Sequence, residues 1–126
     1  MPSISIIMSV FNTESYLEKS IQSVLNQTFS DYEFIVINNG STDGSASIIS
    51  KYQNLDSRIV VIENKKNKSL ACARNQALDI AKGKYIYVID SDDYLETEAL
   101  ESIYKLCQLM LSICQLQVLE KTHIGI

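Results

Sequence analysis

Four short apolar runs alternate along this chain with four segments of helical pattern. The runs are rich in Ile and Val, as strands are, and the segments between them repeat apolar residues every three or four positions, as amphipathic helices do. The predicted strands are residues 3–10, 33–38, 58–63 and 85–89, and the predicted helices are residues 13–25, 45–55, 69–82 and a last one from residue 97 onward. This alternation predicts an α/β fold, a Rossmann-like parallel sheet with helices on both faces.

The fourth run, Tyr-Ile-Tyr-Val-Ile at residues 85–89, shows no alternation of apolar and polar residues. We therefore expect a central strand that is buried on both faces. It ends at Asp90-Ser91-Asp92-Asp93, and carboxylates this close repel one another unless a positive group lies among them. A hard divalent cation, Mn²⁺ or Mg²⁺, held by one or two carboxylates and by substrate phosphates would supply that charge. A polar turn that caps the next helix is the alternative.

Polar or aromatic residues also follow the first two strands, as Phe11-Asn12 and as Asn39-Gly40-Ser41. The carboxyl ends of parallel strands meet at one edge of the sheet, where α/β proteins bind their ligands. The chain has no Gly-x-Gly-x-x-Gly after its first strand and no Walker phosphate loop, which argues against a dinucleotide-dependent dehydrogenase. An aromatic ring, an amide and an acidic cluster suit a nucleoside diphosphate that carries a transferable group, because a metal ion can neutralise the departing diphosphate.

Composition narrows the alternatives further. The 126 residues suffice for one domain, and the net charge of −4, without a long basic run, argues against a nucleic-acid partner. Cys72, Cys107 and Cys114 lack metal-ligand spacing and are predicted to be packed thiols, not a disulfide. The N-terminus has no basic region ahead of its apolar run, and no stretch is long enough to span a membrane. We expect a cytoplasmic protein, either free or at the inner face of the membrane.

Five segments of the chain resemble family 2 of the inverting glycosyltransferases, which have the A-type glycosyltransferase fold. The resemblance covers about residues 3 to 108, in the order and spacing of that family's N-terminal, nucleotide-sugar-binding half. The matching segments are residues 5–12 (SIIMSVFN), 21–28 (IQSVLNQT), 37–43 (INNGSTD), 73–75 (ARN) and 83–93 (GKYIYVIDSDD).

The resemblance implies roles for single residues. Asn39 stands where the family usually has an Asp that accepts a hydrogen bond from the base, and Arg74 would lie near the base and phosphates. Asp92 would bind Mn²⁺ or Mg²⁺, whereas Asp93 is expected only to cap the following turn. Phe11 would pack against the base and Asp90 would face the ribose, and the other residues that the resemblance places at the nucleotide are Val10, Asn12 and Ser91.

The resemblance also implies an activity: metal-dependent transfer, with inversion, of a sugar from a nucleotide-diphospho-sugar, expected to be a UDP-sugar. The acceptor would be a hydroxyl of a glycan or of a lipid-linked molecule in cell-surface polysaccharide synthesis. The family's catalytic base lies on the acceptor-binding half, downstream of the region that this chain matches, so no base is assigned here. The alternatives are a non-catalytic nucleotide-sugar-binding module and a truncated remnant.

The C-terminal residues depart from the family pattern. Residues 1–108 are predicted to form the nucleotide-sugar-binding half, and residues 109–126 an apolar tail without family resemblance. A helix that is apolar on every side needs burial. This tail therefore indicates either a frameshifted end or a helix that binds a protein partner. His123 in the tail is expected to be solvated.

Overall fold

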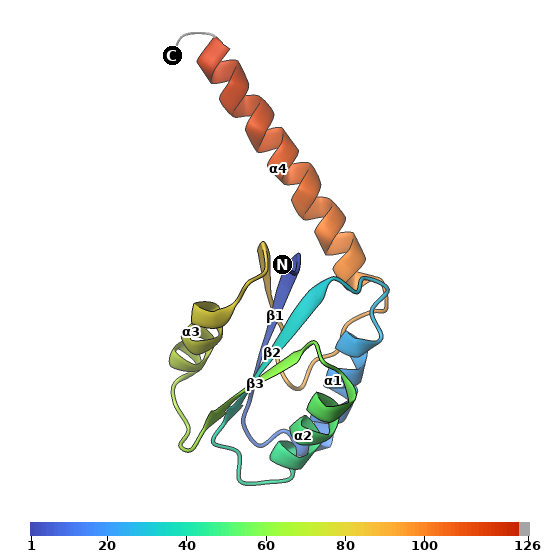
Figure 1. Ribbon diagram of the computed structural model, residues 1–126, viewed down its shortest axis with the longest axis vertical. Helices are drawn as coiled ribbons and strands as arrows, with labels where there is room; N and C mark the ends of the chain where they lie inside the picture. Colours follow the sequence, from blue (N-terminus) through green and yellow to red (C-terminus); the bar gives the residue numbers. More distant parts are fainter. Residues whose placement is uncertain (124–126) are drawn as a thin grey trace.

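The computed structural model describes the backbone of residues 1–123 and the side chains of residues 1–113. Its strands are β1 (Ile4–Val10), β2 (Tyr32–Asn39), β3 (Ile59–Asn64) and β4 (Tyr85–Val88), and its helices are α1 (Glu14–Leu25), α2 (Ser45–Leu55), α3 (Leu70–Ile80) and α4 (Ala99–His123). The four strands form one parallel sheet in the order β3-β2-β1-β4 (Figure 1). The predicted α/β fold and the predicted order of elements are confirmed.

Helices cover both faces of the sheet, as predicted. In Figure 1, α3 lies on one side, and α1 and α2 lie together on the other. β1 and β2 supply side chains to both faces: Ile6 and Phe34 are buried in the larger cluster with α1, while Ile7 and Ile35 are buried with Ala77 of α3. Because neighbouring side chains of a strand point to opposite faces, the two inner strands need apolar side chains on both faces.

β4 is an edge strand, which corrects the prediction of a central strand buried on both faces. It pairs only with β1 among the described residues. Tyr85 and Tyr87 pack against the larger core cluster, whereas Ile86 and Val88, on the opposite face, are each 43% exposed. The prediction failed because an unbroken apolar run shows that a strand has apolar side chains on both faces. It does not show whether other residues of the chain pack against both of those faces.

α3 is also more exposed than its pattern predicts. Only Ala73 and Ala77 are buried in this helix, while the larger apolar side chains of Leu70 and Leu78 are about half exposed. Cys72 is exposed, so its prediction as a packed thiol is wrong; Cys107 is partly buried, and the side chain of Cys114 lies outside the described residues. Small alanines bring α3 close to the sheet, and the larger side chains flanking them then fall outside the contact.

α1 begins at Glu14 with Thr13 as its N-cap residue, although the Thr13 side chain makes no capping bond. Glu18 of this helix pairs with Lys51 of α2 at 2.7 Å. The helix predicted to run to residue 82 ends at Ile80.

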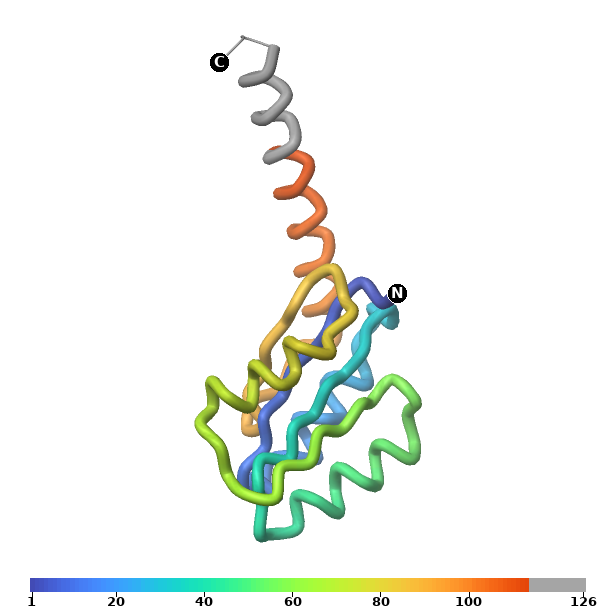
Figure 2. Tube along the Cα trace, turned by 60° about the vertical axis from the view of Figure 1, so that its left-hand side comes forward, coloured from blue at the N-terminus to red at the C-terminus, as the bar shows by residue number. Residues whose placement is uncertain are grey.

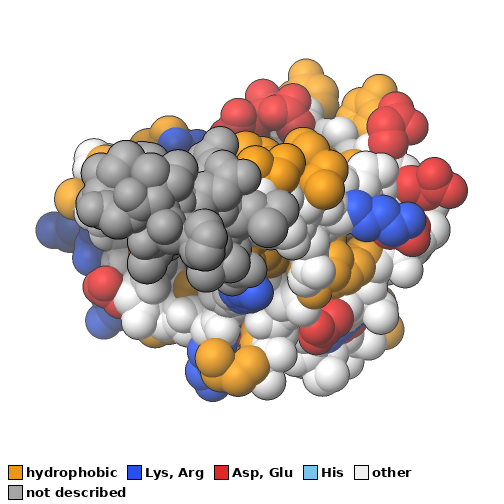
Figure 3. Space-filling model, turned by 90° about the horizontal axis from the view of Figure 1, so that it is seen from above, with side chains coloured by type: hydrophobic (Ala, Val, Ile, Leu, Met, Phe, Trp, Pro, Cys, Tyr) orange, Lys and Arg blue, Asp and Glu red, His pale blue; other side chains and the backbone are white. Residues whose placement is uncertain are grey.

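α4 projects away from the body of the protein (Figure 1). Leu100 is fully buried, and Tyr104 packs against Phe29, with 4.8 Å between the ring centroids. Farther along, exposed apolar side chains accumulate. They are Leu106, Leu109, Met110, Leu111 and Ile113. Figure 3 looks down on this end of the molecule and shows hydrophobic side chains among charged ones on its surface.

Tyr32, at the start of β2, is expected to make the fold less stable at alkaline pH. Burial raises the pKa of its phenol to about 12, while the Arg58 guanidinium, 4.3 Å from the ring centroid, acts in the opposite direction. The folded state therefore keeps the phenol protonated above the ordinary pKa of 10. The resulting stabilisation, roughly 2 to 3 kcal/mol, is fully present below pH 10 and is lost as the pH rises to about 12.

Urea unfolding of the wild type and of Tyr32→Phe between pH 9 and pH 12 measures this contribution. We expect the variant to be less stable at pH 9, because the phenol donates a hydrogen bond to the Val24 carbonyl at 2.9 Å. The difference between the two proteins should shrink as the pH rises, because only the wild type has a phenol to ionise at this position. A difference that stays constant over this range would contradict the assignment.

Candidate nucleotide and metal site

The segment after β1 is shaped by Asn12. This residue has a positive φ of 52°, which Asn tolerates better than most residues. Its side-chain oxygen accepts hydrogen bonds from the backbone N–H groups of Thr42 at 2.8 Å and Asp43 at 3.3 Å. Asn12 therefore ties the end of β1 to the loop after β2. Val10 is buried beneath this junction, and Phe11 projects from it with 47% of its surface exposed, a ring free to stack on a ligand.

Asn39, at the end of β2, points into the protein. It is 3% exposed, and its carboxamide is hydrogen-bonded to Lys68 and Asn64. Its neighbour Asn38 donates to Glu63 at 3.0 Å. The structure thus places Asn39 at the predicted edge of the sheet, with its side chain committed to the loop after β3. Figure 2 shows that loop passing beside the end of β2.

Three carboxylates gather after β4. One oxygen from each of Asp90, Asp92 and Asp93 lies within 4.8 Å of the others, and all three residues are exposed. Hard carboxylate oxygens are the ligands that Mg²⁺ and Mn²⁺ prefer, so the donor set fits the predicted cation. Asp93 was expected only to cap a turn. Its N–H does close a turn onto the Asp90 carbonyl at 3.1 Å, and this turn also brings its carboxylate into the cluster.

The turn that carries the carboxylates is fastened to α1 and its N-terminus. Ser91 is buried, and its hydroxyl accepts a hydrogen bond from Thr13 at 2.9 Å. Ser20 donates to the Asp90 carbonyl at 3.4 Å. Ser91, predicted to bind the nucleotide, therefore has its side chain turned inward, where it helps to hold the carboxylates in place.

Arg74 reaches the acidic cluster from α3. Its guanidinium lies 3.4 Å from an Asp90 oxygen, and the side chain is 35% exposed. Its Nε is buried and has no hydrogen-bond partner among the described residues. A buried donor without a partner is costly, so this nitrogen marks a place where a ligand oxygen would be favourable.

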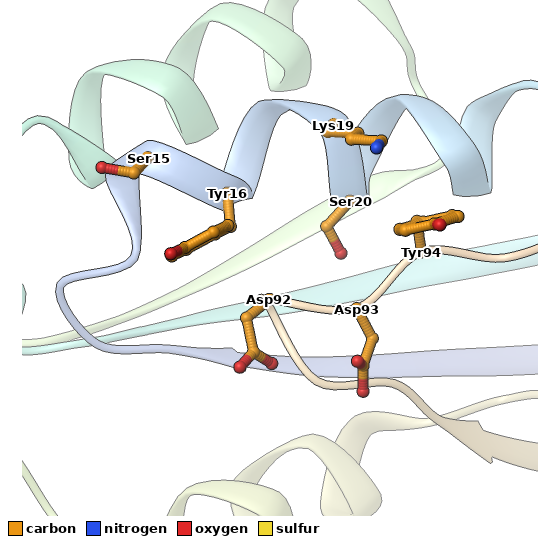
Figure 4. A pocket seen from close by; sticks show the side chains of 7 residues that line it. All are labelled: Ser15, Tyr16, Lys19, Ser20, Asp92, Asp93 and Tyr94. Carbon is orange, nitrogen blue, oxygen red and sulfur yellow. The ribbon is translucent and has the colours of Figure 1, made fainter.

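A cavity of about 290 Å³ lies between α1 and the segment after β4 (Figure 4). Lys19 sits over the Tyr94 ring at 4.3 Å from its centroid and closes one end, and Tyr16 stands at the other. The Asp92 and Asp93 carboxylates point away from α1 in this view. The lining residues are Ser15, Tyr16, Lys19, Ser20, Asp92, Asp93 and Tyr94. Sequence reasoning did not select Tyr16, Lys19 or Tyr94, because their contacts join segments far apart in the chain.

The four-stranded parallel sheet with helices on both faces matches the A-type glycosyltransferase fold of solved structures. Residues 5–118 match the family described as "Glycosyl transferase family 2". The chain belongs to this family.

Relatives and solved structures agree with this assignment. The chain is 40% identical to glycosyltransferase GlyA of Streptococcus pneumoniae over 81% of its own length and 14% of GlyA. It is 45% identical to an uncharacterized glycosyltransferase of Haemophilus influenzae over 80% of its length and 40% of that protein. The crystal structure of S. aureus TarS 1-349 in complex with UDP superimposes with a TM-score of 0.75 at 31% identity, covering 80% of this chain and 30% of TarS 1-349. The chain thus spans less than half the length of these proteins.

Within the part of the chain that the structure describes, no helix is both long enough and apolar enough to cross a bilayer.

Proposed function

We propose that this chain forms the donor-binding part of a metal-dependent glycosyltransferase that uses a UDP-sugar. The observation that carries the proposal is the group of three carboxylates at the strand ends, with the unpartnered Arg74 nitrogen beside it. Carboxylates alone would repel a diphosphate, so they point to a shared cation. The structural relatives include TarS complexes with UDP and with UDP-GlcNAc, which supports uridine as the nucleoside.

Each exposed residue at the sheet edge contacts a different part of the donor in this proposal. Phe11 offers its ring to the base, since stacking on an aromatic face contributes about 1–3 kcal/mol per base. Asp90 faces the ribose, and Arg74 contributes hydrogen bonds to donor oxygens. Val10 and Asn12 fix the direction of the segment that carries Phe11.

Asp92 is the proposed principal ligand of Mn²⁺ or Mg²⁺, and Asp93 and Asp90 are close enough to share it. When bound, the cation neutralises the negative charge of the diphosphate leaving group. The chain's own contribution is to hold these carboxylates at a fixed place through the contacts of Ser91 with Thr13 and of Asp90 with Ser20.

The acceptor, the stereochemistry of transfer and the catalytic base concern the whole protein. We propose transfer with inversion to a hydroxyl of a glycan or lipid-linked acceptor, in the cytoplasm or at the inner face of the membrane. A base must take the proton of that hydroxyl, and we propose that it lies on an acceptor half outside this chain. The exposed apolar side chains of β4 and α4 favour one further candidate, a donor-binding subunit that is completed by a partner.

Calorimetric titration of the purified chain with UDP tests the proposal. We expect binding in the presence of Mn²⁺ and little or none after addition of EDTA. Phe11→Ala should weaken the Mn²⁺-dependent binding about tenfold, because the base loses its stacking partner. Failure of the folded chain to bind UDP with Mn²⁺ would refute the proposed donor site.

A further inference from the structure

The carboxamide of Asn39 makes two hydrogen bonds to the backbone of one residue. Its oxygen accepts from the Lys68 N–H at 3.0 Å, and its nitrogen donates to the Lys68 carbonyl at 2.9 Å. The same oxygen accepts a third hydrogen bond, from the side chain of Asn64 at 3.1 Å. Asn39 therefore pairs with Lys68 much as a neighbouring strand would, and its orientation is fixed by a donor on one side and an acceptor on the other.

This geometry requires an amide. A carboxylate in the same place could accept from the Lys68 N–H, but it has no hydrogen to donate, and its second oxygen would face the Lys68 carbonyl. The two acceptor oxygens would repel each other, and the Lys68 carbonyl would lose its donor. The aspartate expected at this position in the family is therefore incompatible with the loop arrangement of this chain.

Further contacts hold the same loop. Asn64 and Gln76 exchange two hydrogen bonds between their side chains, at 2.8 and 2.9 Å. Asn67 donates to the Asn39 carbonyl at 3.1 Å. Gly40, with a φ of 78°, leaves room for the loop, because a side chain there would run into the backbone of Asn67. Residues 64–68 are thus held against the end of β2 by a network of amides, which we name the amide latch.

The loop held in this way is strongly basic. Lys65, Lys66 and Lys68 are all exposed, and the loop leads directly into α3, the helix that carries Arg74. It lies at the carboxyl edge of β2 and β3, on the edge where the carboxylate cluster follows β4. Fixing this loop therefore fixes positive charge along one side of an acidic site.

We propose that Asn39 is a positioning residue whose carboxamide latches residues 64–68 onto the end of β2, and that the nucleotide is selected by this latched loop together with Phe11, not by Asn39 itself. The second half of this inference rests on the proposed function; the first half does not. The competing arrangement is one in which Asn39 leaves the loop when a nucleotide binds and contacts the base directly.

Trypsin reports on the latch, because it cleaves after lysine and three lysines lie in the loop. Site-resolved mass spectrometry would follow cleavage after Lys65, Lys66 and Lys68, with cleavage after Lys51 in α2 as an internal measure of global unfolding. In Asn39→Asp, without nucleotide, we expect loop cleavage about tenfold faster or more, since proteolysis follows the open population. Cleavage after Lys51 should change much less. Asn54→Asp, the same change at an exposed position of α2, is the matched control and should behave as the wild type.

Two further measurements use UDP with Mn²⁺. In the wild type, saturating UDP should leave loop cleavage unchanged or slow it; faster cleavage would mean that Asn39 abandons the loop for the base and would overturn the proposal. Asn39→Asp should bind UDP about tenfold more weakly, and equal or tighter binding would also overturn the assignment. Loop cleavage in nucleotide-free Asn39→Asp at the wild-type rate would refute the latch. If the wild type binds no UDP, the proposed function fails, and the nucleotide-free proteolysis still decides whether the latch exists.

Discussion

Asp92→Ala is expected to lower the Mn²⁺-dependent affinity of the chain for UDP by about 100-fold or more, since loss of groups that support a metal site already costs 10- to 100-fold. The three carboxylates offer oxygens within 4.8 Å of one another, and Asp92 is the proposed principal ligand among them. Without it, the cation loses a charged ligand and the diphosphate loses the positive charge that offsets the remaining carboxylates. Calorimetry with UDP and Mn²⁺ measures the loss.

The control for this variant is Asp79→Ala, which removes the same side chain from an exposed position of α3. It should bind UDP as the wild type does. In the absence of metal, Asp92→Ala should be at least as stable to heat as the wild type, because one of three mutually repelling carboxylates is gone. Unchanged Mn²⁺-dependent binding in Asp92→Ala would refute Asp92 as the principal ligand of the cation.

Gly83→Ala is expected to destabilise the fold by about 3 kcal/mol, at the upper end of the range for overpacked sites. Gly83 lies just before β4, and its N–H donates to the Ser5 hydroxyl at 2.8 Å. A methyl group on it would run into the backbone of Ile4 and Ser5 in β1. Because backbone atoms cannot swing aside as a side chain can, β4 would have to separate from β1, its single partner among the described strands.

The matched variant is Gly44→Ala, just before α2. There the methyl group would meet only the carboxylate of Glu14, at the end of a flexible side chain. We expect an effect within about 1 kcal/mol, which includes the gain from a stiffer unfolded chain. Chemical unfolding of both variants measures the difference. Equal stabilities of the two variants would show that the approach of Gly83 to β1 can relax without loss.

The sequence predicts the sheet and its functional edge because both depend on local patterns. Apolar runs in β1 and β2 indicate strands, and the rule that parallel strands end at one edge brings Phe11 and the carboxylates together. The position of β4 could not be predicted, since its edge location depends on what pairs beside it. The orientation of Asn39 could not be predicted either. It depends on the loop at residues 64–68, and a sequence does not show which of several polar strand ends will bind one another.

Leu100 is the last fully buried residue among the described side chains. The fully buried core is therefore supplied by residues that precede most of α4 in the chain, and Tyr104 adds a partly buried contact from the second turn of that helix. Domains fold as units during synthesis, the N-terminal one first. Because residues up to Tyr104 close the core among the described side chains, this region can reach its native packing once they have emerged, ahead of the residues that follow them.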